Sequence, residues 1–205
     1  DDGSDVRLLT KEAASEHSPA WIDNDHIAFL TVSAGVQQIF SVDASGKHRK
    51  QLSFMEKDVE GFVFSPDMKN VLMVMSVPNP LVRETQYEDL PKSTGMIADD
   101  LMFRHWDTWV TELPHPYIAA FDGGKVSDKA VDLLEGEPFE SPMLPFGGTE
   151  QFAWSPDGGS LAYTCRKKSG LEYAKSTDSD IFLYNLESGR TVNLCKTDGD
   201  EDRNM

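Results

Sequence analysis

A motif that occurs three times constrains the fold of this chain more than any other feature of its sequence. The copies are SPAWIDNDHIAFLTV from Ser18, GFVFSPDMKNVLMVMSV from Gly61 and QFAWSPDGGSLAYTC from Gln151. The aromatic residues Trp21, Phe64 and Trp154 fall at equivalent positions, with steps of about 43 residues and about twice that. Self-similarity at such a period is the signature of a chain built from stacked supersecondary units.

Each copy predicts two strands joined by a tight turn. Pro66 and Pro156 set φ for the first corner of a turn, and Asp67 and Asp157 can bond back to the backbone behind it. The first copy replaces this turn with Asp23-Asn24-Asp25. A run rich in branched and aromatic residues follows each turn, as a half-buried strand requires.

Two more strand-like segments follow each pair. The third segments begin at Gln37, Tyr117 and Asp180, and the fourth at Arg49, Ala130 and Thr191; VRLLT from Val6 is of the fourth type. Repeated four-stranded antiparallel units are the blades of a β-propeller. We therefore expect an all-β chain, a partial propeller of about three four-stranded antiparallel blades. The expected blades cover residues 12–54, 59–135 and 149–197, with an insertion at 78–116 in the second.

Closed propellers have roughly 4 to 8 blades, so we expect this chain to be the partial N-terminal propeller of a longer protein. Its first and last strands would then be open edges. Because open edges invite pairing, a homo-oligomer formed through them is one expectation.

The insertion is the most informative segment outside the repeats. Ile97, Leu101, His105 and Trp109 recur every four residues, which predicts an amphipathic helix capped by Ser93 or Thr94. In one interpretation this helix packs on the propeller with Trp106 and Trp109 in the core. In the other, Arg104, His105 or Asp107 points into a cavity, and these three residues are the candidates for contact with a substrate.

Topology places the long connections together. In an up-and-down blade, the connection between strands two and three leaves from the same face as the connection between blades. The segments Pro78–Pro116, Glu135–Thr149 and Arg166–Ser179 all belong to that face. Long loops on one face of a rigid scaffold commonly carry function, so we expect this face to meet a catalytic domain.

Composition excludes several functions. A formal charge of −16 opposes binding to nucleic acid, and no apolar run reaches the roughly 18 residues of a membrane span.

The five histidines lack ligand spacing, and Asp198, Asp200 and Asp202 lack the Gly and Glu of a calcium loop, so no metal or cofactor is expected. The string Gly158-Gly159-Ser160-Leu161-Ala162 lacks the last glycine of a nucleophile elbow, so no catalytic residue is expected here.

Cys165 and Cys195 are expected to lie on strands two apart in the third blade. Such strands are about 9 to 10 Å apart, beyond the reach of an unstrained disulfide. We therefore expect two free thiols.

Two segments carry a family resemblance. DDLMFRHWDTW from Asp99 and EYAKSTDSDIFLYNLESGRTVNL from Glu172 resemble dipeptidyl peptidases and acylaminoacyl peptidases of the prolyl oligopeptidase family. The WSPDG and FSPD turns also resemble the TolB propeller. The resemblance to the peptidases implies an N-terminal propeller followed by a C-terminal α/β-hydrolase domain with catalytic Ser, Asp and His. None of these three catalytic positions can be mapped onto the residues of this chain.

The resemblance to the peptidases implies a secreted or periplasmic serine exopeptidase. In that family the propeller restricts a buried site to short peptides, from which dipeptides or blocked residues are removed at the amino terminus. The alternative is a TolB-like periplasmic propeller that binds proteins and has no enzymatic parent. The insertion argues against that alternative, since a binding propeller has no evident need of it.

Overall fold

The computed structural model describes residues 6–84, 92 and 94–195. The described residues are almost entirely strand, turn and loop; their helices are the single-turn η1 (Thr149–Gln151) and the short α1 (Gly170–Lys175). Asp198, Asp200, Asp202 and the expected cap Ser93 lie outside the described residues.

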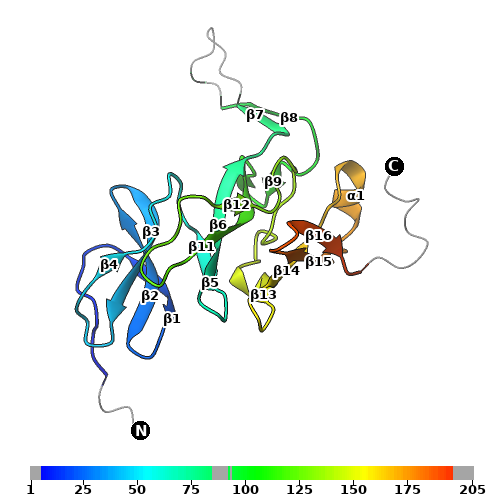
Figure 1. Cartoon of the computed structure of the whole chain (residues 1–205). Coiled ribbons are helices and arrows are strands. Elements are labelled where there is room, and N and C mark those ends of the chain that lie inside the picture. Colours follow the sequence, from blue (N-terminus) through cyan, green and yellow to red (C-terminus); the bar gives the residue numbers. More distant parts are fainter. Residues whose placement is uncertain (1–5, 85–91, 93, 196–205) are drawn as a thin grey trace. The chain divides into compact units, whose positions relative to one another are not determined.

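The described residues form three four-stranded sheets and two two-stranded ones (Figure 1). The first has the order β1-β2-β3-β4 and contains β1 (Glu16–Trp21), β2 (His26–Ser33), β3 (Val36–Asp43) and β4 (Lys50–Gln51). The second has the order β12-β11-β6-β5 and contains β5 (Gly61–Phe64), β6 (Asn70–Pro78), β11 (Glu112–Ala120) and β12 (Val131–Asp132). The third has the order β13-β14-β15-β16 and contains β13 (Phe152–Trp154), β14 (Ser160–Cys165), β15 (Asp180–Asn185) and β16 (Arg190–Asn193).

By its internal contacts the chain divides into two compact units. One comprises Asp1–Met75 with Tyr117–Val131, and the other Ser76–Pro116 with Asp132–Met205. The division passes through β6 and β11, so the insertion and the third sheet belong to the second unit.

The first unit has a continuous apolar core. Buried side chains from the first sheet pack with those of β5, β6 and the end of β11, because alternate residues of each strand face the same side. The core includes Ala28, Leu30, Ile39, Leu52, Phe62, Val71, Met73, Ala119 and Phe121. VRLLT at residues 6–10, expected to be strand-like, forms no strand; it is held by Arg7, which donates to the Ala44 carbonyl at 2.6 Å.

The turns of the second and third copies are built alike. Ser65 donates its hydroxyl to Asp67 at 2.7 Å, and Asp67 accepts the N–H of Lys69 at 3.1 Å. In the third copy Ser155 bonds to Asp157 at 2.6 Å, and Asp157 accepts the N–H of Gly159 at 3.0 Å. The aromatic residues Trp21, Phe64 and Trp154 each end the first strand of their sheet, and Pro66 and Pro156 lie in the turns.

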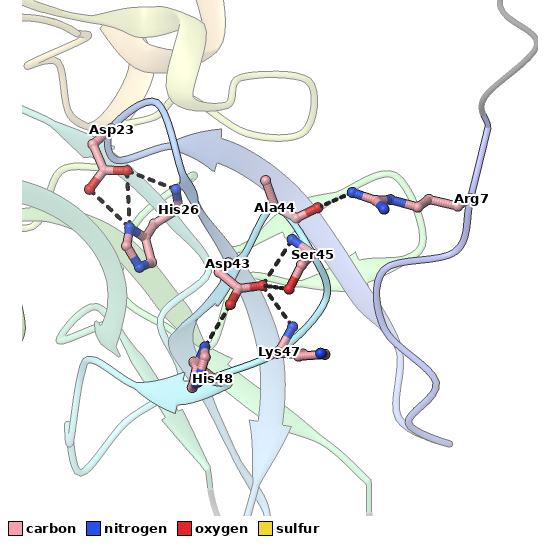
Figure 2. Close-up of polar contacts among 8 residues, drawn as sticks. All are labelled: Arg7, Asp23, His26, Asp43, Ala44, Ser45, Lys47 and His48. Carbon is pink, nitrogen blue, oxygen red and sulfur yellow. Dashed lines mark hydrogen bonds and ion pairs between the residues drawn. The ribbon is translucent and has the colours of Figure 1, made fainter.

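Two aspartates stabilise turns of the first sheet by accepting hydrogen bonds (Figure 2). Asp23 accepts the N–H groups of Asp25 and His26 at 2.7 and 2.8 Å. Asp43 accepts from Ser45 and from the N–H of Lys47, and His48 Nδ1 lies 2.7 Å from its other oxygen. These bonds to the charged form lower the pKa of both carboxyl groups.

The prediction of a helix over residues 97–109 is wrong. The described part of the insertion forms two hairpins, β7 (Val82–Glu84) with β8 (Met96–Ala98), and β9 (Arg104–His105) with β10 (Thr108–Trp109). Trp106 turns the second hairpin with φ of +52°, which no right-handed helix contains. The expected apolar face is also largely exposed: Ile97 is 42% exposed, Leu101 46% and Trp109 42%.

The core assignment of the tryptophans is therefore wrong as well, since Trp106 is 72% exposed. The spacing of four residues failed because it reflected two strands and a turn, in which the apolar side chains do not share one face. Within residues 97–109 the buried residue is Met102, at 5% exposure, although it does not belong to the series of residues spaced by four.

Candidate functional site

The base of the insertion is fastened by one buried amide. Asn79 is 3% exposed and donates to the carbonyl oxygens of Val110 at 2.9 Å and Met102 at 3.3 Å. Its own side-chain oxygen accepts the N–H of Leu81 at 3.0 Å. A small apolar cluster of Met102, Val110 and Leu113 lies beside it and packs against Tyr173 of α1. The insertion is therefore held in place within the second unit by specific hydrogen bonds and by apolar packing.

The β9–β10 hairpin presents His105 to a buried acid. His105 Nε2 lies 3.5 Å from Glu140 Oε2, and the side chains are 16% and 3% exposed. A separation of 3.5 Å is at the outer limit of a hydrogen bond, so His105 compensates the carboxylate only weakly. Glu140 Oε1 is buried and has no hydrogen-bond partner among the described residues.

Arg166 and Tyr173 complete the cluster. The Arg166 guanidinium carbon lies 4.1 Å from the centre of the Tyr173 ring, and its Nη1 donates to the Ser176 carbonyl at 3.4 Å. Burial raises the pKa of Tyr173, and the negative charge of Glu140 raises it further while Arg166 opposes the shift. Arg166 Nε and the Tyr173 hydroxyl are both buried, and neither makes a hydrogen bond of good geometry within the described part of the chain, although the Arg166 guanidinium is close enough to the Tyr173 hydroxyl to lower its pKa.

A single carboxylate joins α1 to the insertion. Asp100 Oδ2 accepts the N–H of Gly170 at 2.9 Å, across 70 residues of sequence. Its other oxygen accepts the N–H of Leu101 at 2.6 Å. Gly170 has φ of +54°, a conformation that favours glycine at the start of α1. Asp100 thereby holds α1, and with it Tyr173, against the insertion.

These four residues, His105, Glu140, Arg166 and Tyr173, form what we call the acid cluster. They come from the three long segments that topology predicted on one face. Burying an unpaired carboxylate, guanidinium nitrogen or hydroxyl costs free energy unless something bonds to it. The unpaired acceptor of Glu140 and the unpaired donors of Arg166 and Tyr173 are therefore suited to a ligand that has both a cation and a carbonyl oxygen.

The other predicted substrate-contact residues lie on the same hairpin but outside this cluster. Arg104 is exposed, with its guanidinium 5.2 Å from the centre of the Trp109 ring. Asp107 is exposed and contacts the Thr108 hydroxyl at 3.5 Å. Of the three candidates, the structure brings His105 to Glu140.

Sequence reasoning missed Glu140, Arg166 and Tyr173. Glu140 and Arg166 lie in no motif, and Glu140 is 35 residues from His105 in sequence. Tyr173 falls in the segment from Glu172 that resembles the peptidases, and all three residues lie in the long segments Glu135–Thr149 and Arg166–Ser179.

The string around Ser160 does not form a nucleophile elbow in the structure. Ser160 begins β14, and its hydroxyl accepts from Asn185 Nδ2 at 3.5 Å across the β14–β15 pair. Among the described residues no group of three His, Cys, Asp or Glu side chains is placed to hold a metal ion. Within the same part of the chain, no helix has the length and apolar character needed to cross a bilayer.

Cys165 and Cys195 are free thiols in the structure, as predicted, although Cys195 lies beyond the fourth strand of its sheet rather than on it. Cys165 ends β14 and is buried, with its Sγ 3.4 Å from the Glu140 carbonyl oxygen. Cys195 is exposed just beyond β16.

The fold and the site define an all-β protein of four-stranded antiparallel sheets with a polar cluster in its loops. No family model matches the chain. It is 47% identical over 197 residues to dipeptidyl-peptidase 5 of Porphyromonas gingivalis, and 39% identical over 196 residues to that of Porphyromonas endodontalis. Each alignment covers 95% of this chain and 28% of the relative. The chain is thus similar to these two proteins and spans less than a third of their length.

A solved structure shares the fold at low sequence identity. The acylaminoacyl peptidase of Pyrococcus horikoshii superposes with a TM-score of 0.55 and 17% identity, over 87% of this chain and 24% of that one. At this identity the likeness concerns the fold alone.

Proposed function

We propose that this chain is the non-catalytic propeller part of a serine exopeptidase of the dipeptidyl-peptidase type. The observation that carries the proposal is the alignment with dipeptidyl-peptidase 5, which runs over 95% of this chain at 47% identity. In this proposal the three sheets are propeller blades. The Ser, His and Asp of catalysis belong to an α/β-hydrolase domain in the rest of the protein, which is periplasmic or secreted.

The propeller controls access in this proposal. The face with the long segments meets the catalytic domain, and the segments narrow the passage so that short peptides enter. Support comes from the acid cluster, which draws one residue or more from each of the three segments and has polar atoms to offer to a peptide.

The acid cluster binds the amino end of the peptide. Glu140 Oε1 is a buried acceptor, and a free α-ammonium group supplies the charge and the N–H bonds that it lacks. Arg166 Nε and the Tyr173 hydroxyl are donors to the first carbonyl oxygen. A peptide with a free amino terminus offers both groups a few ångströms apart, whereas an acetylated one lacks the cation.

The test uses the full-length gene product and chromogenic dipeptidyl anilides. We expect cleavage of substrates with a free amino terminus and a large loss of kcat/KM when the same dipeptides are acetylated. Inactivation by a serine-directed fluorophosphonate would place the reaction in the expected class. Failure of the full-length protein to cleave any of these anilides, with an intact serine triad, would overturn the proposal in favour of a binding propeller.

A further inference from the structure

The helix α1 has few of the features that hold a helix in place. It has six residues, none of them buried, and a helix of this length is not stable by itself in water. Ser169 occupies the position before its first residue, but the side chain of Ser169 does not cap the helix. The other residues of the segment 166–179 are half-buried or exposed. Contacts with other parts of the chain therefore fix the position of α1.

Asp100 supplies the bond that the first turn of α1 otherwise lacks. Its Oδ2 accepts the Gly170 N–H at 2.9 Å, and the N–H groups at the start of a helix need such acceptors. The acceptor is itself fixed, because Oδ1 of Asp100 accepts the Leu101 N–H at 2.6 Å. The next residue, Met102, is buried, and Asn79 donates to its carbonyl oxygen at 3.3 Å. Asp100 thus ties the start of α1 to the buried base of the insertion.

The position of α1 determines where two donors of the acid cluster lie. Tyr173 belongs to α1, three residues after Gly170, and packs against the apolar cluster of the insertion. The Arg166 guanidinium carbon lies over the Tyr173 ring, 4.1 Å from its centre. Arg166 Nη1 also donates at 3.4 Å to the carbonyl oxygen of Ser176, the residue after α1. A shift of α1 therefore moves the Tyr173 hydroxyl and Arg166 together.

We propose that Asp100 is a positioning residue, whose bond to Gly170 places the Tyr173 hydroxyl and Arg166 Nε for donation to the first carbonyl oxygen of a peptide. The inference rests on the proposed function, in which these two groups are the donors. Asp100 acts through α1 and makes no contact with the peptide itself. A displacement of about 1 Å can cost roughly 100-fold in rate, so one bond at the start of a short helix is enough to matter.

The test is a double-mutant cycle in the full-length protein. Asp100→Ala, Tyr173→Phe and the double variant are compared with wild type on dipeptidyl anilides with a free amino terminus. We expect each single variant to lose roughly 5- to 20-fold in kcat/KM, mainly through a higher KM, because a donor to the carbonyl oxygen is displaced or removed. The double variant should lose clearly less than the product of the two single losses, since Asp100 can no longer position a hydroxyl that is absent.

Two further variants control the cycle. Asp100→Asn should recover part of the loss, because its amide oxygen still accepts the Gly170 N–H. Glu172→Gln removes one negative charge from an exposed position on α1 itself, and it should keep kcat/KM within about twofold. Wild-type kinetics in Asp100→Ala, or a double variant that loses the full product, would overturn the proposal. If Asp100→Ala does not fold, Asp100→Ser takes its place in the cycle and the same two outcomes decide.

A measurement without turnover separates this inference from the proposed function. Alaninamide, which has one ammonium group and one carbonyl group, is titrated into wild type and the three variants of the cycle, with binding followed by calorimetry. We expect both single variants to bind it more weakly and the double variant to lose less affinity than the product of the single losses. If the protein cleaves no anilide but shows this coupling, the peptidase proposal fails and the positioning role of Asp100 stands. Independent losses of affinity overturn that role whatever the activity.

Discussion

Glu140 is nearly fully buried, yet the side chain that pairs with it is the ring of His105, whose Nε2 lies 3.5 Å from Oε2. A buried carboxylate ordinarily has close, well-aligned partners, since the loss of hydration is costly. The long contact and the unpartnered Oε1, which has no bond within the described part of the chain, set this acid apart from a structural ion pair. In the proposed function, its missing partner is the ammonium group of a bound peptide.

Replacing this acid should separate binding from folding. In Glu140→Gln the full-length protein should lose roughly 10- to 100-fold in kcat/KM on dipeptidyl anilides with a free amino terminus, because a charged hydrogen bond to the ammonium is lost. The measurements are the steady-state kinetics and the thermal unfolding of Glu140→Gln and of the control variant Glu137→Gln.

Glu137→Gln is the matched control for that experiment. Glu137 lies in the same segment but pairs with Lys167 at 2.5 Å at the surface. We expect it to retain activity within about twofold, as a surface pair contributes little. An equal loss in the two variants would show that charge in this segment acts generally, and would remove Glu140 from the site.

The sequence predicted the sheets well because their signals are local. Ser65 and Asp67 bond to each other and to the backbone within a few residues, so the turn that joins β5 to β6 is specified where it occurs. The same chemistry recurs at Ser155 and Asp157. These contacts need no knowledge of the rest of the chain.

The insertion and the acid cluster were not predictable in the same way. The spacing of Ile97, Leu101 and Trp109 matches a helix, but Trp106 takes a positive φ that breaks the pattern. The contacts that determine the structure of the insertion join residues far apart in sequence. Asn79 bonds to the carbonyls of Met102 and Val110, and Asp100 bonds to Gly170. The period of a short segment carries no information on such partners.

Asn79 should be the critical residue for the insertion. Asn79→Ala removes two donors and one acceptor, and leaves buried carbonyl oxygens unpaired. We expect the free energy of unfolding to fall by about 2 to 3 kcal/mol, measured by urea denaturation.

Asn79→Asp is the informative companion, since it keeps the shape and the acceptor for Leu81 but removes both donors. It should be destabilised at least as much as Asn79→Ala at neutral pH, because a carboxylate would face two carbonyl oxygens. Stability close to wild type in both variants would show that Asn79 does not fasten the insertion.

Asp43 should give the first sheet a dependence on pH (Figure 2). The Ser45 hydroxyl, followed by the Lys47 N–H and His48, lowers the pKa of this carboxyl well below its usual range. A lowered pKa in the folded state means that the stabilisation is complete above the unfolded pKa of about 3.9 and is lost as the pH falls below it. Wild type should therefore exceed Asp43→Asn in melting temperature at pH 7, with the gap narrowing below about pH 4.

Asp25→Asn, in the neighbouring turn, controls for loss of one negative charge from a protein of net charge −16. Its melting temperature should not show the same narrowing gap. A constant difference between wild type and Asp43→Asn from pH 7 to pH 3 would contradict the assignment of this titration to Asp43.

The two thiols should react at very different rates. Burial raises the pKa of Cys165 to about 12, and nearby carboxylates add to the shift while Lys167 opposes it. The thiolate is the reactive form, so at pH 8 Cys165 is both protonated and shielded, whereas Cys195 is exposed. With an aromatic disulfide reagent we expect one thiol to react quickly in the folded protein and the second only after unfolding in urea. Cys195→Ser should abolish the fast phase and keep the slow one, while two fast thiols in the native wild type would show that β14 is open where Cys165 approaches Glu140.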